Sequence, residues 1–114
     1  MVDDSPVLLK IQTSLVSKQG HQVEGVTSGE AAIKQLTANH YDLVLMDVQM
    51  PTMDGLQTTQ KIRSLNLKTP ILALTGNDLP EERAKCLQHG MNGFLAKPLQ
   101  MAAFEVELKK LHLL

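Results

Sequence analysis

Three polar residues, Asp47, Thr75 and Lys97, each directly follow an apolar run of strand length. Uninterrupted apolar runs of four residues are typical of strands covered on both faces in a parallel sheet. The carboxyl ends of parallel strands meet at one edge of the sheet, where ligands bind. We therefore expect these three side chains to emerge together. The adjacent pair Asp3 and Asp4 precedes the first predicted helix and is expected at the same edge.

This set of side chains points to phosphoryl-transfer chemistry. Crowded carboxylates repel one another and raise one another's pKa unless a cation lies between them. Mg²⁺ prefers a few carboxylates together with phosphate oxygens, so it suits Asp3, Asp4 and Asp47. The Lys97 ammonium and the Thr75 hydroxyl could then hold a phosphoryl group, whose transfer depends mainly on positioning and charge neutralisation.

Each site residue also has a purely structural interpretation. An Asp after a strand is often a helix N-cap, and Asp54 beside Gly55 fits a cap or turn better than a ligand. Thr75 alone could be a strand-end residue, and Lys97 alone a solvated charge. Their occurrence together with Asp47 favours the functional interpretation.

Helical and strand patterns alternate along the chain. Ser5 with Pro6 predicts a helix start, and Thr27 with Glu30 a capping box for the second helix. Apolar positions at helical spacing are Val7, Leu8, Ile11 and Leu15 in the first helix, Ala84 and Leu87 in the fourth, and Met101, Phe104, Leu108 and Leu111 in the last. A third helix runs from Gly55 to about Leu65, and the fourth from Pro80 to Gly90. The predicted strands are Gln22–Val26, Leu43–Met46, Ile71–Leu74 and Gly93–Ala96.

This alternation predicts a three-layer α/β domain with a doubly wound parallel sheet, formed by residues 1–114 as a single domain. The net charge of −1 and the 3% aromatic content leave no basic or stacking surface for nucleic acid. No apolar run approaches the ~20 residues of a membrane span. With the lone Cys86 and no signal-peptide pattern, we expect a cytoplasmic protein that is not inserted in a membrane.

The chain resembles receiver domains of the two-component response-regulator family over nearly its whole length. The resemblance rests on Asp3-Asp4, on Asp47 followed by Met50-Pro51 and Met53-Asp54-Gly55, on Thr75-Gly76, and on Lys97-Pro98, in the expected order and spacing. The segment from Cys86 to Pro98 further resembles receivers of hybrid sensor histidine kinases and phosphorelays.

The resemblance implies that Asp47 accepts a phosphoryl group from a phosphohistidine on a sensor kinase or a histidine phosphotransfer protein. It implies Mg²⁺ held by Asp4, Asp47 and the carbonyl of Gln49, with Asp3 acting mostly through water. Thr75 and Lys97 would contact the phosphoryl oxygens.

The resemblance also implies a conformational switch and partners. Thr75 and Phe94 would be the switch residues, and the Lys97-Pro98 peptide is expected to be cis. Gln49 and Asn77 occupy positions that tune hydrolysis of the acyl phosphate. A homodimer stays open as a further partner.

The family fold is the flavodoxin-like one with strand order 2-1-3-4-5, and here its first strand is truncated. Only Met1-Val2 precede the acidic pair, and two strand residues span about 7 Å. Three explanations stay open: a fragment of a longer chain, a strand reduced to a stub, or a partner that fills the gap.

Two other functions stay open. One is an interaction module with the receiver fold that is not phosphorylated. A less favoured one is an aspartyl-nucleophile phosphatase, because such enzymes place a second Asp two residues after the nucleophile, where this chain has Gln49. Whether the protein counts as an enzyme is left open, since its only expected catalysis is its own phosphorylation and dephosphorylation.

Overall fold

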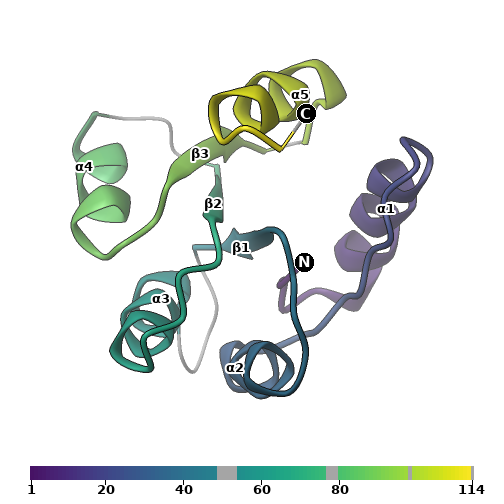
Figure 1. The fold of residues 1–114 in the computed structure, drawn as a ribbon. Helices are drawn as coiled ribbons and strands as arrows, with labels where there is room; N and C mark the ends of the chain where they lie inside the picture. The colour runs from purple at the N-terminus through teal and green to yellow at the C-terminus, as the bar shows by residue number, and fades with distance from the viewer. Residues whose placement is uncertain (49–53, 77–79, 98, 114) are drawn as a thin grey trace.

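A computed structural model describes residues 1–48, 54–76, 80–97 and 99–113. Figure 1 shows the chain order of its helices and strands. The elements are α1 (Pro6–Ser17), α2 (Gly29–Ala38), β1 (Val44–Asp47), α3 (Gly55–Ser64), β2 (Ile71–Thr75), α4 (Pro80–Gln88), β3 (Gly93–Ala96) and α5 (Met101–Lys110). The longest of these helices, α1, has 12 residues, and none in the described ranges could span a bilayer.

The sheet is parallel, with β2 between β1 and β3. On the other side of β1, Val2 forms parallel bridges to both Met46 and Val26. The spatial order is therefore the Val26 segment, Val2, β1, β2 and β3, which confirms the predicted order 2-1-3-4-5. The first strand is reduced to the single bridging residue Val2.

The predicted strand Gln22–Val26 is wrong over most of its length, because only Val26 pairs. Its backbone hydrogen bonds run to the few residues of the first strand: the Val26 N–H donates to the Met1 carbonyl, and the Asp3 N–H donates to the Val26 carbonyl. A strand needs a ladder partner along its length, and among the described residues this segment pairs only with Met1 to Asp3.

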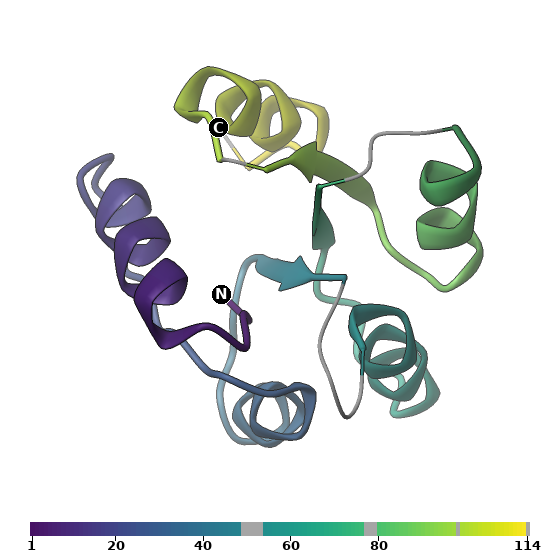
Figure 2. The same cartoon turned by 180° about the vertical axis from the view of Figure 1, so that it is seen from behind.

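Two apolar cores lie on opposite faces of the sheet. Helices cover both sides of the sheet, as the predicted three-layer fold requires (Figures 1 and 2). One joins Val2 and Met46 to residues of α2, α3 and α4. The other joins Leu45 and Leu72 to residues of α1 and α5. Covered on both faces, every residue of β1 and β2 is buried, which is why both strands are apolar up to their last residues, Asp47 and Thr75.

Side-chain caps fix where three helices begin. The hydroxyl of Ser5 accepts from the Leu8 N–H, and the carboxylate of Asp54 accepts from the Gln57 N–H, as predicted. For α2 the predicted cap is one residue too early. Ser28, and not Thr27, accepts from the Ala31 N–H.

The buried faces of α1 and α4 differ from the predicted ones. In α1 the buried residues are Leu9, Gln12 and Val16. The more apolar stripe lies outside, with Val7, Leu8 and Ile11 exposed by 69%, 45% and 53%. In α4 the buried residue is Cys86, while Ala84 and Leu87 are exposed. The predicted apolar face of α5, in contrast, does point inward through Phe104 and Leu108.

Candidate functional site

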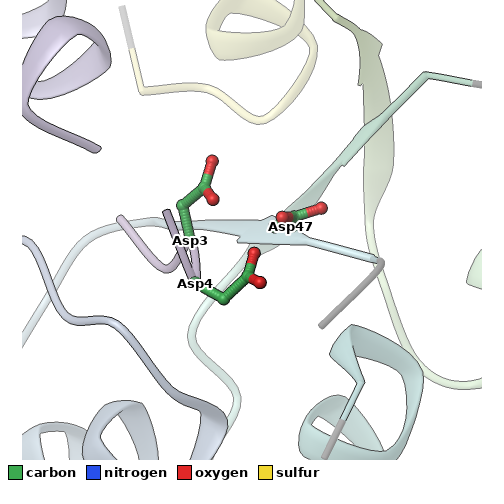
Figure 3. A group of neighbouring side chains, drawn as sticks. All are labelled: Asp3, Asp4 and Asp47. Atoms are coloured by element: carbon green, nitrogen blue, oxygen red, sulfur yellow. The ribbon is translucent and has the colours of Figure 1, made fainter. Parts of the chain in front are cut away.

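Three carboxylates gather where β1 ends (Figure 3). The pairing of Val2 with Met46 sets Asp3 beside Asp47, the last residue of β1, and Asp4 follows. One oxygen from each of the three carboxylates lies within 4.8 Å of the others. Asp3 and Asp47 are buried, with 1% and 2% of their surface exposed, whereas Asp4 is exposed. The structure thus brings the predicted acidic residues together.

Thr75 ends β2 and Lys97 directly follows β3, so both lie at the same edge of the sheet as Asp47. The Lys97 ammonium donates to Oδ1 of Asp47 at 2.8 Å, and these side chains are 27% and 3% exposed. Thr75, the last residue of β2, is buried. Parallel pairing aligns the ends of β1, β2 and β3 at one edge, as predicted from the strand-end pattern.

Asp3 carries the clearest electrostatic signature of the site. Burial raises the pKa of its carboxyl, and the charges of Asp47 and Asp4 raise that pKa further. The hydrogen bond from the Ser5 N–H and the charge of Lys97 lower the pKa, but by less. The Ser5 N–H donates to Oδ1 of Asp3 at 3.0 Å. Its buried Oδ2 has no hydrogen-bond partner among the described residues. Burying a carboxylate oxygen without a hydrogen-bond partner, beside other acids, is unfavourable for folding. A bound cation would offset this cost.

The donor set fits a hard divalent cation. All the candidate ligand atoms are carboxylate oxygens, and one of the three carboxylates is exposed, which leaves a side open to solvent. Mg²⁺ prefers oxygen ligands and keeps several waters, so it binds through one or two carboxylates plus phosphate oxygens. The residues present therefore suit Mg²⁺ better than a softer metal that seeks Cys or His ligands.

Two glycines shape the surroundings of Asp47. A Cβ on Gly55 would lie 2.4 Å from the Asp47 carbonyl oxygen, so a glycine here allows α3 to begin directly against the end of β1. A Cβ on the exposed Gly76 would meet nothing within 4 Å. The position after Thr75 therefore leaves space beside the site.

Phe94 lies half-buried in β3, packed against the core on the α2, α3 and α4 face. The guanidinium of Arg83, in α4, lies 4.4 Å from the centre of its ring, within the range of a cation–π interaction. The sequence offered no signal for this contact, because it depends on how α4 packs against β3.

Several predicted site features lie outside the described residues. They are the carbonyl of Gln49 as a metal ligand, Asn77 as a tuning residue, and the cis isomer of the Lys97-Pro98 peptide. These stay predictions.

Residues 1–109 match the family described as "Response regulator receiver domain". The chain is 40% identical over 101 residues to the sensor histidine kinase RcsC of Escherichia coli K12; this match covers 89% of the chain but only 11% of the kinase.

Solved structures agree with this match. The chemotaxis protein CheY4 of Vibrio cholerae superposes with a TM-score of 0.88 at 29% identity, covering 96% of this chain and 92% of that one. The receiver domain of the sensor histidine kinase PA1611 of Pseudomonas aeruginosa superposes with a TM-score of 0.84 at 36% identity, covering 96% of this chain and 91% of that one. The PA1611 structure is described with a magnesium ion coordinated in the active site cleft.

Proposed function

Because the chain belongs to the response regulator receiver domain family, we propose that it is a phosphoacceptor of a two-component phosphorelay and that Asp47 takes the phosphoryl group. The observation that carries this proposal is the cluster of Asp3, Asp4 and Asp47 with the Lys97 ammonium 2.8 Å from Asp47. Phosphoryl transfer depends on a positioned nucleophile and on positive charge near the phosphoryl oxygens. The Asp47 carboxylate can supply the first, and the Lys97 ammonium with a cation held by the acids can supply the second.

Each residue of the cluster has a distinct role in the proposal. Asp47 is the nucleophile, and one of its carboxylate oxygens attacks phosphorus while the donor's imidazole leaves. Asp3, Asp4 and Asp47 would hold Mg²⁺, together with the carbonyl of Gln49. When bound, Mg²⁺ supplies positive charge to the phosphoryl oxygens. Lys97 exchanges its contact with Asp47 for one with a phosphoryl oxygen, and Thr75 donates its hydroxyl to another.

The proposed output is a change at the surface around β3 and α4. A phosphoryl group adds strong hydrogen-bond acceptors, and their contact with Thr75 would draw the end of β2 inward. Phe94 would then move, and its ring would leave the Arg83 guanidinium. Arg83 belongs to α4, so this movement would reach the helix surface that a partner contacts.

The proposed phosphodonor is a phosphohistidine on a sensor kinase or a histidine phosphotransfer protein, in the cytoplasm. The likeness to a sensor histidine kinase and to a kinase receiver domain supports this class of partner. The exposed apolar stripe of Val7, Leu8 and Ile11 offers such a partner a docking surface, because α1 begins two residues after Asp4.

The alternative is a receiver-like interaction module that is not phosphorylated in use. The short first strand supports it, because Val2 is the one residue of the segment carrying Asp3 and Asp4 that forms β-bridges. A shift of this short segment would weaken the metal site while leaving the rest of the fold in place.

A phosphorylation assay separates these functions. The protein is incubated with Mg²⁺ and acetyl phosphate, and intact mass spectrometry follows the added phosphoryl group. We expect one adduct that disappears in Asp47→Asn and with EDTA. Asp54→Asn is the matched control, because Asp54 caps α3 and should leave the adduct. No adduct on folded protein would favour the interaction module, and sustained hydrolysis of phosphate esters would favour a phosphatase.

A further inference from the structure

Helix α4 is held unevenly against the rest of the fold. It lies beside β3, at one edge of the sheet (Figure 1). Cys86, in its last turn, is the one buried residue of this helix, and Met91 just after the helix is buried as well. Residues 80–85 are exposed, except Glu82, which is half-buried. The carboxyl end of α4 is therefore packed into the core, whereas its amino-terminal half is not.

Hydrogen bonds from one side chain fix the carboxyl end further. The Arg63 guanidinium, in the last turn of α3, donates through Nε to the Gly90 carbonyl at 3.0 Å and through Nη2 to Oδ1 of Asn92 at 2.9 Å. Oδ1 of Asn92 also accepts from the Ile71 N–H at 2.9 Å, and the Asn92 N–H donates to the Ile71 carbonyl at 2.7 Å. The segment that follows α4 is thus tied both to α3 and to the start of β2.

The same guanidinium requires a glycine where α4 ends. Gly90 has a φ of 101°, a left-handed conformation that favours glycine, and a Cβ here would lie 2.8 Å from Cγ of Arg63. Nη1 of Arg63 donates to the carbonyls of Leu67 and Thr69 at 2.8 and 2.9 Å. The Arg63 clamp, as we name these hydrogen bonds to residues 67, 69, 90 and 92, holds the carboxyl end of α4 through a planar, pre-organised group.

The amino-terminal half of α4 has a weaker attachment, the contact between Arg83 and Phe94. The Arg83 guanidinium lies 4.4 Å from the centre of the half-buried Phe94 ring, although Arg83 itself is exposed. A cation–π contact at an exposed site changes an equilibrium by about two- to fivefold. An event at the phosphorylation site can overcome a contact of that strength.

Phe94 lies where such an event would reach it. The pairing of β2 with β3 sets Phe94 opposite Ala73, two residues before Thr75. Strand side chains two residues apart point to the same face of the sheet, so Thr75 points to the same side as Ala73. Phe94 packs against the core that contains Ala73. A displacement of Thr75 therefore acts on the face of the sheet where Arg83 contacts the ring.

We propose that α4 acts as a lever: the Arg63 clamp fixes its carboxyl end, and the contact of Arg83 with Phe94, which we name the latch, holds its amino-terminal half. This inference rests on the proposed phosphorylation of Asp47, which would move Phe94 away from the guanidinium. The closed latch opposes that movement, so Arg83 regulates the site. A weaker latch favours the switched conformation, and a phosphoryl analogue should then bind more tightly by the same factor.

Beryllofluoride tests the latch, because with Mg²⁺ it binds a carboxylate as an analogue of a phosphoryl group. Arg83→Gln removes the cation at an exposed position and keeps a polar side chain. We expect the dissociation constant of beryllofluoride, measured by titration, to fall about two- to fivefold. Lys85→Gln is the matched control, since it removes the same charge from another exposed position of α4. It should leave the constant unchanged.

The ring gives two further measurements. The chain has two phenylalanines, so labelling with fluorophenylalanine gives two fluorine resonances, and Phe94→Leu identifies the one from Phe94. In the unmodified protein, Arg83→Gln should shift this resonance toward its position in the beryllofluoride complex, whereas Lys85→Gln should not. In a Phe94→Leu background, Arg83→Gln should no longer change the dissociation constant, because the latch is already lost.

Amide hydrogen exchange tests the fixed end of the lever. In the unmodified protein, Arg83→Gln should speed exchange of the Ala84 amide, in the amino-terminal half of α4, about two- to fivefold. The Asn92 amide, which donates to the Ile71 carbonyl beside the Arg63 clamp, should keep its rate.

An unchanged dissociation constant in Arg83→Gln would overturn the latch, as would an equal effect of Lys85→Gln. Equally faster exchange at Asn92 and Ala84 would overturn the fixed end. If the wild type takes neither beryllofluoride nor a phosphoryl group, the proposed phosphorylation fails. The lever is then decided by exchange in the unmodified protein, where equal Ala84 rates in the wild type and Arg83→Gln would overturn it.

Discussion

Folding favours the neutral form of the Asp3 carboxyl, whereas metal binding requires its charged form. Its pKa is raised by burial and by Asp47 and Asp4, so between the unfolded and folded pKa values the folded state binds more protons. Stability of the metal-free protein should therefore fall as pH rises through that window. A cation that holds the charged form would remove this penalty.

The substitution Asp3→Asn tests that balance. Asn keeps the oxygen that accepts from the Ser5 N–H but removes one charge. In EDTA we expect the free energy of unfolding to rise by about 1 kcal/mol, with a weaker decline as pH increases. The stabilisation by excess Mg²⁺ should shrink.

Urea unfolding with and without Mg²⁺ measures both effects. Asp42→Asn is the matched control, since Asp42 is exposed and distant from the site. Equal Mg²⁺ stabilisation of the wild type and Asp3→Asn would contradict a role for Asp3 in the metal site.

Lys97 is expected to act on the phosphoryl group more than on the metal. Lys97→Met removes the cation 2.8 Å from Asp47 and keeps much of the apolar stem. We expect the rate of phosphorylation by acetyl phosphate to fall about 100-fold, while Mg²⁺ affinity, measured by calorimetry, stays the same or rises. An unchanged rate would exclude Lys97 from transition-state stabilisation.

At the scale of the elements, the junction of β1 and α3 determines where Asp47 lies. Gly55→Ala would bring a Cβ within 2.4 Å of the Asp47 carbonyl oxygen, so one of the two elements must shift. We expect a loss of about 1–3 kcal/mol in the free energy of unfolding, measured by urea denaturation. Gly76→Ala, where a Cβ meets nothing, should cost less than ~1 kcal/mol. Equal losses would show that the close contact does not matter.

The exposed apolar stripe of α1 is expected to contact a partner protein. Ile11→Glu changes an exposed side chain of its apolar stripe, and should slow phosphotransfer from a phosphohistidine partner about tenfold. Phosphorylation by acetyl phosphate should not change, because no docking is involved. Val106→Glu, equally exposed on α5, is the control. If both variants slow both reactions alike, the stripe is not a docking surface.

The helices show what could and could not be predicted from the sequence. In α1 two stripes share helical spacing, and the fold buries the less apolar one, which contains Gln12. Periodicity identifies a helix but cannot choose between two such stripes, because that choice depends on the neighbouring elements. The same ambiguity explains why Cys86, and not Leu87, is buried in α4.

The site was more predictable than the helix faces. The strand-end pattern predicted that Asp47, Thr75 and Lys97 lie at one edge of the sheet, and they do, because parallel pairing aligns the ends of strands. The sequence could not tell which of Asp3 and Asp4 is buried, since adjacent strand residues point to opposite sides and the register of Val2 with Met46 selects Asp3. The contact of Arg83 with Phe94 could likewise not be predicted from the sequence.

At the scale of the whole molecule, the first strand is expected to limit stability, because among the described residues only Val2 forms bridges there. Fusing Val-Leu-Ile-Val before Met1 would extend this strand between the Val26 segment and β1. Each buried methylene contributes about 0.8 kcal/mol, so we expect thermal unfolding to move upward by at least about 5 °C. A fusion of Gly-Ser-Gly-Ser is the control. No difference between the two fusions would mean that the added residues do not extend the first strand.

The position of the phosphoryl group is the most direct test of the proposed phosphorelay role. Protein phosphorylated by acetyl phosphate is reduced with borohydride, which converts an aspartyl phosphate to homoserine, and the modified residue is identified by tandem mass spectrometry. The proposed phosphorelay role predicts homoserine at position 47 alone, and only when Mg²⁺ was present. Modification at another residue, or none in folded protein supplied with Mg²⁺, would contradict it.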